Sequence, residues 1–300
     1  NYTECKALMF PVYESPFYNN STVGAGNFRA SATFTSHLSG TVFTAVSEYF
    51  PSGGVDEDKI KLYVSYNRGV EWILKSTFAG FSNTVDCRPN EMDLEVIISG
   101  SDTIAFITTG YDFSGHALSG MLRVNVATGA NSFSVWQCGG WNLASVNTYN
   151  PRVTSNNTKY GNTASVFMTV SHDSAVISGF KATQRYAILL SPFADNLLTY
   201  RVPNTASGGF YWSHTTLNRP YVWQDICFID SSGSDILYTT YYNKYGTYSF
   251  IYSARSYDYG NTSVSAFTTQ TIQGDTADEI RLVSCGGSNN QNMLIGVRQR

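Results

Sequence analysis

The chain has 300 residues, enough for one large all-β domain or two ordinary domains. Charged residues make up only 14% and aromatic residues 15%, a balance that excludes a disordered chain and a long coiled coil. The formal net charge is −3 without a run of Lys or Arg, so we expect no nucleic-acid partner. No stretch approaches about 18 apolar residues, so we expect no transmembrane segment.

The predicted elements, in chain order, are short antiparallel strands in a repeating unit. A β-rich run recurs about every 60 residues, which indicates a repeat architecture. The five copies begin at Thr41, Thr103, Ser165, Asp235 and Met293. Each copy follows another strand and a polar turn, and in four copies a third strand, a turn and a fourth strand come next. We therefore predict an all-β fold, a β-propeller of about five four-stranded blades.

The prediction treats the whole chain, residues 1–300, as a single domain. Its approximate repeats are 27–86, 87–148, 149–217, 218–277 and 278–300. The fifth repeat contains only two strands. Either a strand at 6–13 pairs with them and closes the ring, which would protect the sheet edges, or a further blade is missing.

A turn pattern appears twice, each time between the third and fourth strands of a repeat. Its two copies are Ser65, Asn67, Gly69 and Trp72, and Ser256, Asp258, Gly260 and Thr262. We expect the Asn or Asp side chain to accept backbone N–H groups and the Gly to supply a positive φ. A following Trp would cover the apolar side of the hairpin. The corresponding turns at 125–133 and 191–200 do not follow the pattern.

The turn pattern resembles the Asp-box of sialidases and other BNR-repeat propellers, where it is a structural element. The first repeat is also similar to the first blade of bacterial sialidases, because Arg29 opens its first strand and an acidic loop follows at 53–58. This resemblance implies that Arg29 binds a substrate carboxylate and that Asp56, or alternatively Asp58, is the general acid/base. The later repeats contain no match to the further Arg residues and the Tyr–Glu pair of that family.

Charged residues recur near the start of each predicted first strand, which in a propeller lines the central channel. These candidate ligand-binding residues are Arg29, Asp93, Arg152, Asp225 and Glu279. They form either structural ion pairs or a polar ligand site, in which two carboxylates could support acid/base hydrolysis. Two aromatic residues in loop-like clusters, Trp212 and Tyr242, either pack in the core or stack on sugar rings.

The abundance of Ser, Thr, Asn and Tyr, together with five N-glycosylation sequons, predicts a secreted or cell-surface protein. No cofactor motif or metal-ligand spacing is recognisable, so we expect neither group. We expect a recognition or adhesion propeller that binds a glycan or an extracellular protein, rather than an enzyme. The alternatives are a sialidase-like glycoside hydrolase and a self-assembling domain of a larger surface protein or filament.

Overall fold

The computed structural model describes most of the chain from residue 27 onward as β-structure. The described residues are 27–36, 40–52, 55–79, 85–99, 102–113, 116–135, 148–155, 166–173, 182–189, 212–213, 224–231, 234–245, 248–256, 270–273, 277–285 and 292–299. The expected strand at 6–13 lies outside them. Among these residues there is no helix that is long and apolar enough to cross a membrane.

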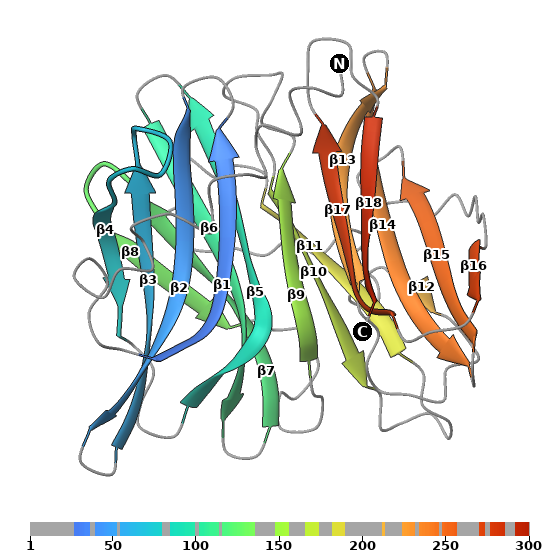
Figure 1. Ribbon diagram of the computed structural model, residues 1–300, viewed down its shortest axis with the longest axis horizontal. Helices are drawn as coiled ribbons and strands as arrows, with labels where there is room; N and C mark the ends of the chain where they lie inside the picture. The colour runs from blue at the N-terminus through green and yellow to red at the C-terminus, as the bar shows by residue number, and fades with distance from the viewer. Residues whose placement is uncertain are drawn as a thin grey trace.

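Within the described residues the strands form five antiparallel sheets, which we call blades 1 to 5 in chain order (Figure 1). Blade 1 contains β1 (Asn27–Ser36), β2 (Thr41–Ser52), β3 (Val55–Ser65) and β4 (Ile73–Phe78). Blade 2 contains β5 (Val85–Ser99), β6 (Asp102–Phe113), β7 (His116–Asn125) and β8 (Asn131–Val135). Strands that are consecutive in the chain are neighbours in each sheet, so both blades are simple meanders.

The remaining blades follow the same order. Blade 3 contains β9 (Thr148–Ser155), β10 (Val166–Asp173), β11 (Ala182–Leu189) and β12 (Trp212–Ser213). Blade 4 contains β13 (Gln224–Ser231), β14 (Ser234–Tyr245), β15 (Tyr248–Ser256) and β16 (Gln270–Gln273). Within the described residues blade 5 contains two strands, β17 (Ala277–Cys285) and β18 (Asn292–Gln299).

The first strands of the blades lie next to one another. Contacts join β1 to β5, β5 to β9, β9 to β13 and β13 to β17. In Figure 1, β5, β9 and β17 accordingly lie between blade 1 on the left and blade 4 on the right. The topology thus places the first strand of each described blade beside the first strand of the next.

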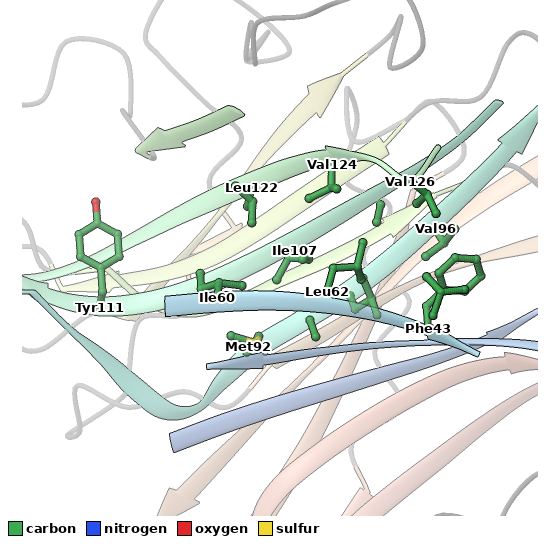
Figure 2. Close-up of a cluster of buried hydrophobic side chains, with 14 of the residues drawn as sticks. Phe43, Ile60, Leu62, Met92, Val96, Ile107, Tyr111, Leu122, Val124 and Val126 are labelled. Atoms are coloured by element: carbon green, nitrogen blue, oxygen red, sulfur yellow. The ribbon is translucent and has the colours of Figure 1, made fainter. Parts of the chain in front are cut away.

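A large apolar core fills the space between blades 1 and 2. Because side chains alternate between the two faces of a strand, Leu94 and Val96 of β5 point to the same side as Ile107 of β6. They pack there against Ile60 and Leu62 of β3, and Figure 2 shows Leu62 beside Ile107. These side chains are at most 4% exposed, so this junction is held mainly by the hydrophobic effect.

The outer strands of blades 1 and 2 are joined by polar contacts. Ser76 of β4 donates its hydroxyl to the carbonyl oxygen of Gly129 at 2.9 Å, and Asn131 Nδ2 donates to Ser76 Oγ at 2.8 Å. Gly129 has a φ of +74°, and a Cβ atom there would lie 2.5 Å from the carbonyl oxygen of Lys75. The close approach of the two blades therefore requires glycine at this position.

Four of the five first strands have an irregular register close to their starts. The shifts lie between Phe28 and Ala30 in β1, between Cys87 and Met92 in β5, opposite Val170 in β9, and between Ala277 and Glu279 in β17. Such bulges bend a strand and leave backbone groups without ladder partners. In β5 and β9, where the residues beside the bulges are buried, such backbone groups need other hydrogen-bonding partners.

The acidic segment that the sequence analysis placed in a loop is part of a strand. Asp56 lies in β3 opposite Pro51 of β2, and Asp58 lies opposite Tyr49. The β2–β3 hairpin continues past the apolar segments of its two strands. This is possible because the hydrogen bonds between strands use the backbone and do not require apolar side chains. The position of Asp56 is therefore determined by the strand register rather than by a loop.

Candidate functional site

The five charged residues expected at the central channel all lie on first strands. They are Arg29 on β1, Asp93 on β5, Arg152 on β9, Asp225 on β13 and Glu279 on β17. The structure describes the side chains of Asp93 and Arg152, whereas for the other three it describes the backbone. These five strands are the ones that contact one another from blade to blade.

The two aromatic candidates lie elsewhere in their blades. Trp212 belongs to β12, opposite Gln184, and Tyr242 belongs to β14, opposite Ile251. Neither strand is the first of its blade, so the topology does not place these residues on the strands that carry the charged group. Asp56 is likewise on β3, two strands away from Arg29 in blade 1.

The first Asp-box-like turn is built by its own side chains. Asn67 Oδ1 accepts the backbone N–H of Glu71 at 2.8 Å and the hydroxyl of Ser65 at 2.9 Å. Ser65 Oγ in turn accepts the N–H of Gly69 at 2.8 Å, and Gly69 has a φ of +87°. Trp72 packs against Val46 and Tyr63. These contacts describe a structural turn that needs no ligand.

In the second copy of the pattern, Ser256 is the last residue of β15. Asp258, Gly260 and Thr262 lie outside the described residues.

The turn between β7 and β8 uses a similar device that the sequence pattern did not reveal. Asn125 Oδ1 accepts the N–H groups of Ala127 and Thr128 at 3.0 and 3.1 Å, and Gly129 N–H donates to the Asn125 carbonyl at 2.8 Å. Here the glycine is four residues after the Asn instead of two. The sequence does contain a signal for this turn, namely the Asn and the Gly, because these residues favour turns at several spacings.

Two acidic side chains of β5 meet the neighbouring strand β9 at the junction of blades 2 and 3. Asp93 and Glu95 lie on the face of β5 opposite to Leu94, because alternate residues of a strand point to opposite sides. Asp93 Oδ2 accepts the backbone N–H of Val153 at 3.0 Å. Ser155 donates its hydroxyl to Glu95 Oε1 at 2.6 Å. Blade 3 thus provides one donor for each of these two carboxyl groups.

Arg152 is fully buried at the same junction, with 0% of its surface exposed. Its Nη1 donates to the carbonyl oxygens of Met92 at 3.5 Å and Pro151 at 3.3 Å, and Thr108 Oγ1 also donates to Pro151 at 3.3 Å. Met92 and Pro151 adjoin the bulges of β5 and β9. Arg152 and Asp93 therefore bind backbone groups of the irregular strands, which is a structural role.

Glu95 differs from its neighbours because its described hydrogen bond is to a side chain rather than to the backbone. The pKa of Glu95 is raised to about 8, mainly by burial; the hydrogen bond from Ser155 opposes this change and the negative charge of Asp93 adds to it. Near neutral pH the Glu95 carboxyl group is therefore mostly protonated. A buried carboxylic acid can donate a proton or a hydrogen bond, as well as accept one.

The described part of the chain contains no group of three or more His, Cys, Asp and Glu side chains that could hold a metal ion. Its chemically distinctive feature is the acidic pair on β5, and within this pair the protonated Glu95.

No protein-family model matches the chain, and no curated protein matches it in sequence. Solved structures are similar in fold. An α-L-arabinofuranosidase from Fusarium graminearum in complex with an iminosugar inhibitor has a TM-score of 0.53 and 12% identity, over 90% of this chain and 74% of that one.

Two further structures are similar at lower scores. An α-L-arabinanase from Penicillium chrysogenum with arabinobiose has a TM-score of 0.47 and 14% identity, over 86% of this chain and 71% of that one. An endo-arabinase from Bacteroides thetaiotaomicron has a TM-score of 0.44 and 11% identity, over 92% and 95%. The five meander sheets with neighbouring first strands, together with the similarity to the arabinofuranosidase, show that this chain has the β-propeller fold.

Proposed function

We propose that this propeller is a secreted or cell-surface protein that recognises glycans. The observation that carries the proposal is the acidic pair Asp93 and Glu95 on an inner strand, with Glu95 protonated near neutral pH. A neutral carboxyl group can both donate to and accept from sugar hydroxyls. The α-L-arabinofuranosidase that shares the fold, bound to its iminosugar inhibitor, supports a sugar-like ligand. The low charge and the sequons support the extracellular location.

A screen on a glycan array that includes arabinan oligosaccharides and sialosides tests this proposal. We expect the purified chain to bind at least one glycan class and the variant Glu95→Ala to bind it at least about tenfold more weakly, because a polar contact is lost. Asp102→Asn, which changes an exposed residue of the same blade, is the control and should bind normally. A folded chain that binds no glycan would contradict the proposal and favour a protein partner or self-assembly.

Glycoside hydrolysis is the second candidate function, and the raised pKa of Glu95 beside Asp93 favours it. Glycosidases use two carboxyl groups, one of which stays protonated until it is needed. Glu95 would donate its proton to the glycosidic oxygen as the bond to the anomeric carbon breaks. Water would add to that carbon and lose its proton to a second carboxylate. The sialidase-like arrangement with Arg29 and Asp56 stays a prediction from the resemblance.

The variant Glu95→Gln separates the two functions. Its amide keeps the shape and the hydrogen-bonding groups of the protonated acid but has no proton to transfer. If Glu95 only binds, Glu95→Gln should retain most of the glycan affinity that Glu95→Ala loses. If Glu95 is a general acid, hydrolysis of the bound oligosaccharide should fall by about a hundredfold or more while binding is retained. Arg29→Ala tests the sialidase-like alternative on the same substrates.

A further inference from the structure

The hydroxyl group of Ser155 reaches from blade 3 to a carboxyl oxygen of blade 2. We propose that Ser155 is a positioning residue, which orients the Glu95 carboxyl group and makes its proton easier to transfer near neutral pH. The proposal rests on the hydrolytic function considered for Glu95. It adds that the proton donor, Glu95 of blade 2, is oriented by a residue of blade 3.

Packing of its two neighbours holds the backbone of Glu95 in place. Leu94 and Val96 on either side are buried in the core between blades 1 and 2. Glu95 itself points away from that core, toward β9. The hydrogen bond of 2.6 Å from Ser155 is the contact that the described residues provide for orienting its carboxyl group.

Charged side chains lie near Glu95 on β5, β7 and β9. Asp93 lies two residues away on the same face of β5. Across the sheet, Phe106 of β6 lies opposite Glu95, and Arg123 of β7 lies opposite Phe106. On β9, the guanidinium group of Arg152 donates to backbone carbonyl oxygens. Among the described side chains, the hydrogen bond to the Glu95 carboxyl group therefore comes from the neutral Ser155.

The Ser155 hydroxyl acts on the protonation of Glu95. It lies 2.6 Å from Glu95 Oε1, and a hydroxyl that donates to a carboxyl group stabilises its charged form. Ser155 accordingly lowers the pKa of Glu95, against burial and the charge of Asp93. Without Ser155 the acid would hold its proton more tightly and would be less well oriented.

The variants Ser155→Ala and Ser155→Thr test the proposal. The readout is the titration of the Glu95 carboxyl carbon by NMR in protein labelled with ¹³C-glutamate, in which Glu95→Gln identifies the signal. A second readout is the pH profile of kcat/KM for the glycan that the chain hydrolyses. Ser119→Ala is the control, since it removes the hydroxyl of a buried serine on β7 that makes no hydrogen bond among the described residues.

We expect Ser155→Ala to move the Glu95 titration and the basic limb of the pH profile upward by about one pH unit. Ser155→Thr should restore both, since it keeps the hydroxyl, and Ser119→Ala should change neither. A titration of Glu95 that is the same in Ser155→Ala and the wild type would overturn the proposal, even if the variant is less stable.

The two hypotheses can fail separately. A shifted titration without hydrolysis of any tested glycan would leave the Ser155–Glu95 contact established, remove its catalytic role and contradict the hydrolase function. Hydrolysis with an unchanged pH profile in Ser155→Ala would support the hydrolase function and contradict the role of Ser155.

Discussion

The pH dependence of stability tests whether the Glu95 carboxyl group is buried and protonated as the structure indicates. Burial raises its pKa from 4.5 to about 8, so between these pH values the folded chain keeps a proton that the unfolded chain has lost. The free energy of unfolding contributed by this group is therefore fully present below pH 4.5. It decreases as the pH rises and is lost above about pH 8.

The magnitude follows from the size of the change. At about 1.4 kcal/mol for each pH unit, the interval from 4.5 to 8 corresponds to an upper limit of about 5 kcal/mol. Glu95 retains some solvent exposure, which screens the charged form, so we expect about 2–3 kcal/mol. The variant Glu95→Gln has no proton to lose at this position and should not show this decrease.

Urea unfolding at pH 5, 6, 7, 8 and 9 measures the effect. We expect the stability of Glu95→Gln relative to the wild type to increase up to about pH 8 and then to level off, because the contributions of the other titrating groups cancel in the comparison. Asp102→Asn, which removes an exposed carboxylate, should follow the wild-type curve. A constant difference between Glu95→Gln and the wild type from pH 5 to pH 9 would refute the reasoning and place Glu95 in water.

Three further predictions concern the scaffold, and urea unfolding measures each of them. Gly129→Ala should destabilise the chain more than Gly40→Ala. Both residues have a positive φ, which costs an alanine about 1–2 kcal/mol, but only at Gly129 would the new Cβ atom lie 2.5 Å from a backbone oxygen. Equal effects would contradict the close approach of blades 1 and 2. Asn67→Ala should cost about 1–2 kcal/mol because the three hydrogen bonds of the Asn67 side chain are lost. A neutral result would show that the turn folds without them. Ser119→Ala should be neutral or stabilising by up to about 1 kcal/mol, since the buried hydroxyl of Ser119 makes no hydrogen bond among the described residues. A marked loss of stability would instead show that this hydroxyl has a hydrogen-bonding partner.

Much of the scaffold is predictable from local patterns. The five β-rich runs mark the second strands of the five blades, because a strand buried on both faces requires a continuous apolar segment such as the one in β6. Turn chemistry is also local, and the hydrogen bonds of Ser65 and Asn67 are formed within the seven residues 65–71. The turn at Asn125 was missed because its glycine comes at a different spacing.

The sequence by itself determined the class of fold, the repeat and the candidate charged residues on the first strands, because all of these depend on periodicity and on neighbours in the chain. Only the tertiary structure decided which of those residues share an environment. Ser155 and Glu95 are separated by 60 residues in the chain, yet the contact between β5 and β9 brings them within hydrogen-bonding distance. Burial at that junction changes the protonation of Glu95 and gives Arg152 a structural role. This burial depends on packing between blades, which no local sequence pattern specifies.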